Sequence, residues 1–445
     1  MRTTLLYLSL SICLGLSAQQ GPTVFGLEEA VEYGLKNNPS IQNASLEIQK
    51  AYKERWATIA IGLPQISTSG SYQNFLELPV SLVPAQFFGG NEGEFAELQF
   101  GTNQNMVGSV QVNQLIFDGS YVVGVQASTV YLKISELGYE KTSIEVRKAI
   151  VDAYGTVLLA RENAAILAKN KKNLEKTLAE TKKIVANGFA EEENVEQLAL
   201  TLSRLDIQLN YANNLKVITT NMLKWVMGMP EEDSLELAQT LEELVALKIL
   251  ASFSDSEFNI DNNVDLKFAE NNMEADILLY RLEKSKALPS LSAFVNGTYT
   301  GNANEFNFTQ PDQKWFYSSL FGVNLQLPIF SSLMRSAKTQ KAKLAVVQAE
   351  TRLEDTRNRL SIELEMTLND VNLALKNYTT SKKDLALAER IEQKNKVKYL
   401  EGISSSFELR EAQQQLYTVQ NQYLQSMKAV IDAKTKLETL TNTAK

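Results

Sequence analysis

The sequence is poor in the residues that carry most enzyme and metal chemistry. Histidine is absent from the 445 residues, and cysteine occurs once, at Cys13, in a segment that we expect to be removed. The mature chain then has no imidazole, thiol or disulfide, which excludes histidine-dependent triads, the usual zinc sites and cysteine nucleophiles. The formal net charge of −8 argues against a nucleic-acid partner, because such a partner requires a basic face.

Long apolar runs are also absent beyond the N-terminus, so we expect no transmembrane helix in the mature chain. The N-terminus has a basic start at Arg2, an apolar run from Leu5 to Leu16 and a small residue at Ala18. This pattern predicts a secretory signal peptide over residues 1–18. The alternatives are a buried N-terminal helix and a lipoprotein acylated at Cys13. The large residue that precedes this cysteine disfavours the lipoprotein.

Proline and glycine are scarce, with 9 and 21 residues, which leaves room for very long helices. Residues 331–400 contain neither and would form a helix of roughly 100 Å, far too long for one globular core. Apolar residues recur along it at steps of mostly three, four or seven: Val346, Leu353, Leu360, Leu364, Leu368, Val371, Leu375, Tyr378 and Leu385. This seam predicts side-by-side packing with other long helices.

The chain contains two copies of one unit, over residues 19–227 and 263–445, with a small insert at 228–262 between them. Each copy runs helix, strand, strand, long helix and return helix. The first helices begin at Asn37-Asn38-Pro39 and Asn262-Asn263-Val264, and they end at Leu63-Pro64 and Leu288-Pro289. The long helices are expected at about Tyr121 to Ala186 and Ser331 to Leu400, and the return helices at about Glu193 to Met227 and Phe407 to Leu440.

The predicted strands alternate between apolar and polar residues. Leu291, Ala293, Val295 and Tyr299 alternate with Ser292, Asn296 and Thr298, and the strands near residues 110 and 323 behave alike. This pattern suits a membrane barrel with a wet interior, and a soluble sandwich is the alternative. Four strands are too few to close a barrel of this kind. An open sheet in lipid would leave the backbone hydrogen-bonding groups of its edge strands unpaired. The membrane interpretation therefore requires several chains.

The order of these parts resembles the TolC family of outer-membrane efflux channels over nearly the whole mature chain. The resemblance rests on the Leu-Pro pairs, the strand-to-helix junctions near 117 and 330, the glycine turns at 188 and 402, and the segment Trp225-Val226-Met227-Gly228-Met229-Pro230. The long first loop, residues 76–105, is similar to a loop of members from the Bacteroidetes.

The resemblance implies a mainly α fold with a small β part and no enzymatic activity or cofactor. Three chains would form a 12-stranded β-barrel in the outer membrane, which continues into a long α-helical barrel in the periplasm. Such a homotrimer is an exit duct for small molecules or secreted proteins. It works with a periplasmic adaptor and an inner-membrane pump of the RND or ABC type. The segment 228–262 would lie outside the long helices as an equatorial collar.

The resemblance also implies a gate where the helices turn at the periplasmic tip. Glu408 and Glu411 occupy positions of the family's pore-constricting acids, and Tyr399 that of a gate tyrosine. Ser404 and Asn194 replace an arginine and an acid of the family's latch. A solvated helix start that favours acids is the alternative for Glu408 and Glu411.

The family's adaptor contacts would lie around the turns at Gly188 and Gly402, which are also expected to cap helices. Two other classes of protein are weighed against the duct. A soluble periplasmic coiled-coil adaptor is disfavoured because adaptors carry one helical hairpin within a β-rich body. A secreted hydrolase with paired carboxylates is disfavoured because the acids lie on repetitive helix faces.

Overall fold

The computed structural model describes residues 23–189, 191–250 and 259–442. The predicted signal peptide lies outside the described residues. The described chain falls into two compact units, which we treat separately. The helical unit draws on segments 1–44, 139–264 and 359–445, and the strand unit draws on segments 45–138 and 265–358.

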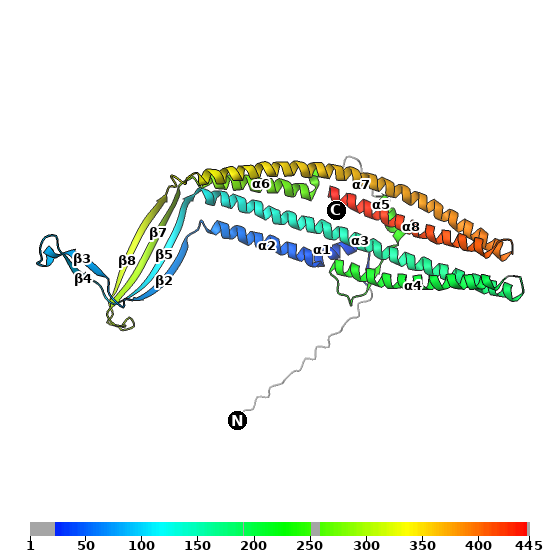
Figure 1. Cartoon of the computed structure of the whole chain (residues 1–445), viewed down its shortest axis with the longest axis horizontal. Helices are drawn as coiled ribbons and strands as arrows, with labels where there is room; N and C mark the ends of the chain where they lie inside the picture. Colours follow the sequence, from blue (N-terminus) through cyan, green and yellow to red (C-terminus); the bar gives the residue numbers. More distant parts are fainter. Residues whose placement is uncertain (1–22, 190, 251–258, 443–445) are drawn as a thin grey trace, which may run out of the picture. The chain divides into compact units, whose positions relative to one another are not determined.

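The chain is mainly α-helical with a small β part, as predicted (Figure 1). The helices are α1 (Leu27–Asn37), α2 (Pro39–Ala60), α3 (Gly119–Ala186), α4 (Glu192–Met227), α5 (Leu241–Leu250), α6 (Val264–Ser285), α7 (Met334–Leu400) and α8 (Ser406–Thr441), with 3-10 turns η1 (Ala85–Phe88) and η3 (Ile260–Asn262). The strands are β1 (Thr23–Phe25), β2 (Gln65–Asn74), β3 (Val80–Pro84), β4 (Phe95–Gln99), β5 (Gln104–Asp118), β6 (Leu235–Leu237), β7 (Ser290–Ala303) and β8 (Trp315–Gln326). The predictions of the two long helices and the two return helices are confirmed to within three residues at each end.

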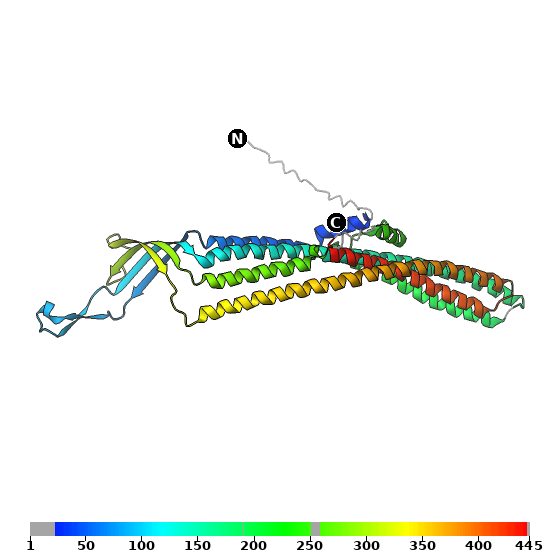
Figure 2. The same ribbon diagram turned by 90° about the horizontal axis from the view of Figure 1, so that it is seen from above.

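In the helical unit, α3 pairs with α4 and α7 pairs with α8 as two antiparallel hairpins (Figure 2). The largest buried cluster includes Ile150 and Tyr154 of α3, Met227 of α4 and Ile431 of α8. The buried residues of α8 recur every three or four positions, so one face of this helix is committed to the core. The predicted α7 seam is buried or half-buried throughout, and Val371 is buried within this single chain.

Two asparagines close the ends of the return helices in the same way. The Asn38 side-chain amide donates to the Val226 carbonyl in the last turn of α4, at 2.6 Å. The Asn263 amide donates to the Leu440 carbonyl in the last turn of α8, at 2.8 Å. Carbonyls at a helix end lack intrahelical partners, so each amide satisfies one that the helix leaves open. The two asparagines that mark the sequence repeat therefore do the same structural work.

Gly228 ends α4 with a left-handed backbone at φ +71°. A Cβ atom at this position would lie 2.5 Å from the Asn37 carbonyl oxygen. Glycine is required here both by the φ angle and by the close approach of α1.

The segment after Gly228 packs against the main core. Its strand β6 pairs in parallel with β1, and Leu244 and Val245 of α5 are fully buried in the main core. Its apolar residues therefore complete the core, and its position as an equatorial collar stays a prediction. Neither α1 nor the β1–β6 pair was predicted.

The strand unit contains one four-stranded antiparallel sheet in the order β2-β5-β7-β8 (Figure 1). Its strands match the four that the alternation predicts. Directly opposed residues point to the same face, so the register sorts the side chains of all four strands. One face carries Ile66, Val112, Val295 and Phe321 in a single row, and the other carries Ser69, Ser109, Thr298 and Ser318.

The long first loop is more ordered than predicted. It contains a β3–β4 hairpin that closes through η1 and a left-handed glycine, Gly89. The alternating residues at 80–82 carried the signal for this strand, but the prediction treated the whole stretch as a loop.

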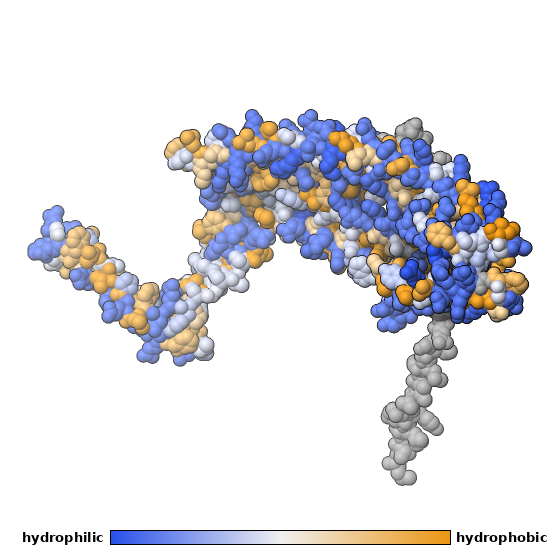
Figure 3. Space-filling view, turned by 45° about the vertical axis from the view of Figure 1, so that its right-hand side comes forward, coloured by the Kyte–Doolittle hydropathy of each residue, from blue (hydrophilic) through white to orange (hydrophobic). Residues whose placement is uncertain are grey.

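Large apolar side chains are exposed in both units, and Figure 3 shows orange residues at the surface of the sheet and of the helices. Within the described residues, no helix combines the length and the apolar character needed to cross a membrane.

Candidate functional site

Two equivalent turns join the helices of the helical unit's two hairpins. Gly188 and Gly402 adopt φ angles of +77° and +72°. After each glycine, a backbone N–H reaches back five residues, from Phe189 to the Ile184 carbonyl at 3.0 Å and from Ile403 to the Lys398 carbonyl at 2.9 Å. These are Schellman caps, so the predicted capping role of both glycines is confirmed. The residue after each glycine is a large apolar one, with Phe189 84% and Ile403 76% exposed.

Glu408 sits in a capping box at the start of α8. The Ser405 hydroxyl accepts from the Glu408 N–H at 3.3 Å, and the Glu408 carboxylate accepts from the Ser405 N–H at 3.2 Å. Ser404 also donates its hydroxyl to this carboxylate, and these hydrogen bonds lower the pKa of Glu408. The pattern Ser-x-x-Glu was visible in the sequence as a capping box.

Glu408 and Glu411 are both exposed and line one groove of about 690 Å³ on α8. The structure therefore brings the two predicted acids together on one face, and it links Ser404 to the first of them. The capping role is real, but it leaves the Glu408 side chain exposed and ionised, which a charged constriction also requires.

Tyr399 is buried and ties α7 to α3. Its hydroxyl lies 3.2 Å from the hydroxyl of Thr181, which is fully buried. Thr181 gives its only hydroxyl proton to the Thr177 carbonyl at 2.9 Å, so Tyr399 is the donor in this pair. The gate-tyrosine candidate thus forms a contact within one chain.

Asn194 lies in the first turn of α4, where its backbone N–H donates to the Glu191 carbonyl at 3.1 Å. A hydrogen bond close in sequence to Asn194 joins the starts of α4 and α8. The Arg410 guanidinium donates to the Gln197 side chain at 2.8 Å. The Arg410 guanidinium also lies over the Phe407 ring, 5.3 Å from its centre. Sequence reasoning missed this arginine because it expected one at position 404.

Further from the turns, polar contacts join the helices of the unit. Lys171 of α3 pairs with Asp206 of α4 at 2.5 Å. The buried Asn170 side chain donates to Gln420 of α8 at 2.8 Å. The second of these contacts joins two helices that sequence spacing alone did not place together.

One carboxyl pair in the helical unit is sensitive to pH. Lys428 of α8 contacts Asp152 of α3 at 3.0 Å and also pairs with Asp432. Burial would raise the pKa of Asp152, but hydrogen bonds with Asp432 and Lys428 outweigh it and lower this pKa. Burial raises the pKa of Asp432 from 3.8 to about 6. Asp152 also raises this pKa, and Lys428 lowers it.

We predict that the protein gains stability as the pH falls from 7 to about 4. The raised pKa of Asp432 means that the folded state binds a proton in this window that the unfolded state does not. Because the Asp432 side chain is 45% exposed, the gain is about 1 kcal/mol rather than the full linkage value. The lowered pKa of Asp152 acts below this window.

Thermal midpoints of Asp432→Asn should vary less between pH 5 and pH 7 than those of the unmodified protein. The control is Asp370→Asn, which removes a carboxylate from an exposed pair with Lys436. An unchanged pH slope in Asp432→Asn would contradict the assignment.

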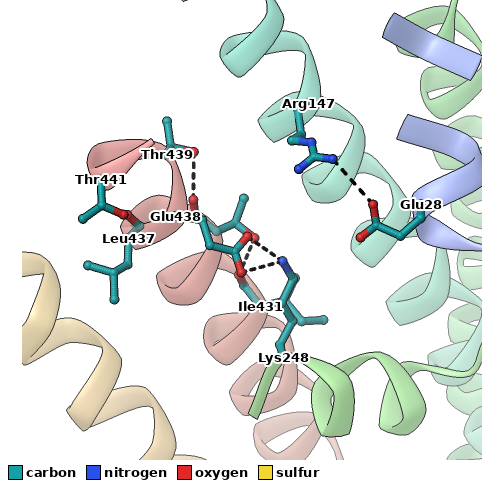
Figure 4. Close-up of polar contacts among 9 residues, drawn as sticks. Glu28, Arg147, Lys248, Ile431, Leu437, Glu438, Thr439 and Thr441 are labelled. Carbon is teal, nitrogen blue, oxygen red and sulfur yellow. Dashed lines mark hydrogen bonds and ion pairs between the residues drawn. The ribbon is translucent and has the colours of Figure 1, made fainter. Parts of the chain in front are cut away.

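A buried ion pair joins α5 to α8. Figure 4 shows Lys248 pointing at Glu438, whose two carboxylate oxygens lie 2.9 and 2.6 Å from the ammonium. Both side chains are almost enclosed, at 13% and 14% exposed. Burial lowers the pKa of the neighbouring Lys434, and the positive charge of Lys248 lowers it further. The negative charge of Glu438 raises this pKa. Glu438 therefore compensates two buried ammonium groups.

Lys248→Met should lower the free energy of unfolding by about 3 kcal/mol, because it leaves the Glu438 carboxylate buried without this partner. Glu438→Gln should cost more, since Lys434 also loses its attraction. Denaturant unfolding measures both. Lys50→Met, in an exposed pair with Glu47, is the control and should cost less than about 0.5 kcal/mol. Equal small effects in all three variants would contradict the role of this pair.

The fold and the turns define a class of protein. Its chain has two long helical hairpins and four strands in which apolar and polar residues alternate. The model of the outer membrane efflux protein family matches residues 31–229 and 259–443, and the chain belongs to this family. It is an outer-membrane exit duct of an efflux system, in a family of passive channels. This excludes the adaptor and the secreted hydrolase that the sequence left open.

Individual relatives are distant in sequence but similar over most of their length. Nodulation protein T of Rhizobium leguminosarum bv. trifolii is 20% identical over 395 residues, covering 88% of this chain and 80% of that protein. The outer membrane protein VceC of Vibrio cholerae superposes with a TM-score of 0.73 at 15% identity, covering 93% of this chain and 95% of VceC. The CmeC outer membrane channel of Campylobacter jejuni gives a TM-score of 0.71 at 18% identity, covering 93% and 85%.

Proposed function

We propose that three copies of the chain close a 12-stranded barrel in the outer membrane, with four strands from each copy. The single observation that carries this proposal is the sheet of the strand unit. Its outer strands β2 and β8 each pair on one side only, and its two faces are sorted into apolar and polar. Such edges are untenable in lipid unless neighbouring copies pair with them. The helices would continue the barrel as a periplasmic tunnel.

The turns of the helical unit would form the periplasmic tip of this tunnel. Three copies would place Glu408 and Glu411 in two rings of carboxylates that constrict the pore and favour cations. Support comes from their exposure and shared groove. Tyr399, Ser404 and Asn194 are the latch candidates, and the contacts of Tyr399 with Thr181 and of Arg410 with Gln197 would hold the closed state.

The same tip would dock a periplasmic adaptor. The caps at Gly188 and Gly402 present Phe189 and Ile403 to solvent, and exposed apolar residues at two equivalent turns are suited to helix-tip contacts. The adaptor would connect the duct to an inner-membrane pump of the RND or ABC type. The cargo would be small molecules or, with an ABC pump, secreted proteins.

Export to the outer membrane would depend on a signal peptide at residues 1–18. We also propose that residues 19–227 and 263–445 are two copies of one ancestral unit, separated by the insert at 228–262. The matching Asn38 and Asn263 contacts support this division.

Native mass spectrometry of detergent-extracted protein tests the proposal. The expected particle contains three chains and comes from the outer-membrane fraction. A monomer, or a stable particle of a different copy number from the same fraction, would overturn the three-copy barrel.

A further inference from the structure

The polar face of the sheet carries mainly hydroxyls and amides. A few apolar residues lie among them, including Val107, Phe294, Phe316 and Leu320. A complete row crosses all four strands, because Ser69 pairs with Ser109, Ser109 with Thr298, and Thr298 with Ser318. The Ser69 and Ser109 hydroxyls are 2.7 Å apart, and those of Thr298 and Ser318 are 2.5 Å apart.

Amide contacts continue this surface on both sides of the hydroxyl row. The Asn105 side chain donates to Asn302 at 2.8 Å, and Asn296 lies 3.5 Å from Gln111. The polar groups of neighbouring strands thus satisfy one another across the sheet.

The same face carries no formal charge. Among the residues of β2, β5, β7 and β8, Asp118 is the only one with a charged side chain. Asp118 lies at the end of β5 and accepts from the Ser120 and Tyr121 N–H groups at 2.6 and 3.0 Å, so it caps α3. Ion-selective pores are commonly lined by rings of charged side chains, and this sheet has none to offer.

A second uncharged surface follows the carboxylates on α8. Spacing of three or four residues carries the exposed face from Glu411 through Gln415, Thr418, Gln422 and Gln425. Several of these residues line a groove of about 1010 Å³, and nine of its 19 lining residues are Asn or Gln. None of the 19 is charged.

We propose that the duct has a charge-free wall rich in amides and hydroxyls, and that discrimination by charge is confined to Glu408 and Glu411. This inference rests on the proposed function, because it takes the polar face of the sheet and the exposed face of α8 to be the interior. Amides and hydroxyls both donate and accept, so the wall offers weak hydrogen bonds to any polar cargo and holds no ion tightly. The cargo class is neutral, zwitterionic or cationic organic molecules, with anions disfavoured only at the tip.

The scarcity of cysteine gives a direct test, since Cys13 is the only thiol. Single cysteines are placed at Ser109 and Thr298 on the polar face, at Val110 on the apolar face, and at Gln415 on α8. The purified assembly is then treated at 0.15 M salt with a cationic and an anionic methanethiosulfonate of similar size. Ser109 lies five residues, about 17 Å, from the loop end of β5, which is about two screening lengths at this salt concentration.

At Ser109→Cys and Thr298→Cys the two reagents should react at rates within about twofold of each other. At Gln415→Cys the cationic reagent should react about tenfold faster, and Glu408→Gln/Glu411→Gln should reduce this preference to near parity. A preference above about fivefold for either charge at Ser109→Cys or Thr298→Cys would overturn the charge-free wall. The proposal would also be overturned if the anionic reagent reacted faster at Gln415→Cys, or if the two reagents reacted there at the same rate.

Val110→Cys separates this inference from the proposed function. It should react at least about a hundredfold more slowly than Ser109→Cys, because its side chain would face lipid or detergent. Equal reaction at Ser109→Cys and Val110→Cys, or no reaction at Ser109→Cys, would overturn the barrel assignment itself, and the wall with it.

Discussion

Val295→Lys is expected to abolish assembly of the protein in the outer membrane. Val295 lies on the apolar face of β7, is 49% exposed in the single chain, and stands between Val112 and Phe321 in the sheet. A lysine facing the middle of the bilayer costs about 2–4 kcal/mol, and each copy in the barrel incurs that cost. The amount of assembled protein in the outer-membrane fraction is the measurement.

The neighbouring residue supplies the matched control. Asn296 lies on the opposite face of the same strand, opposed to Gln111. Asn296→Lys introduces the same side chain into the proposed wet interior, so assembly should be close to that of the unmodified protein. If both variants assembled equally, or if Asn296→Lys were the more damaging, the assignment of the two faces would be wrong.

Neutralising the tip carboxylates should remove cation preference and block by a trivalent cation. In a planar bilayer, a trivalent ion on the periplasmic side should block the unmodified duct, and Glu408→Gln/Glu411→Gln should weaken this block by at least about tenfold. Three charges at each of two rings act together on one ion, which gives the effect its size.

Glutamine is the appropriate replacement because it retains the capping box. A glutamine at the third helical position can still accept from the Ser405 N–H, so α8 should begin at the same residue. Gln415→Glu is the converse variant and should strengthen the block. Unchanged block in the double variant would remove Glu408 and Glu411 from the constriction.

The long helices were predictable because their signals are local. An uninterrupted run without proline or glycine, with apolar residues spaced by three or four, specifies α7. Gly188 marks the end of α3, and Gly402 marks the end of α7. The strands were predictable from their alternation, and the same alternation sorts their faces in the sheet.

The missed features depend on contacts between distant segments. The β1–β6 pair joins three residues near position 24 to three near 236, and neither segment carries a strand signal strong enough by itself. The contacts of Tyr399 with Thr181 and of Arg410 with Gln197 join residues more than 200 positions apart. The resemblance to the family pointed to the acids at 408 and 411, but it could not show which residues of another hairpin lie near them.

Single-channel conductance of the purified assembly in a planar bilayer tests the central claim most directly. The account predicts discrete, cation-preferring current steps from an assembly of three chains. Tyr399→Phe combined with Arg410→Ala should increase the time spent open, because these changes remove the contacts that tie the turns together. An assembled protein that passes no current, either unmodified or with both changes, would contradict the assignment of this chain as an exit duct.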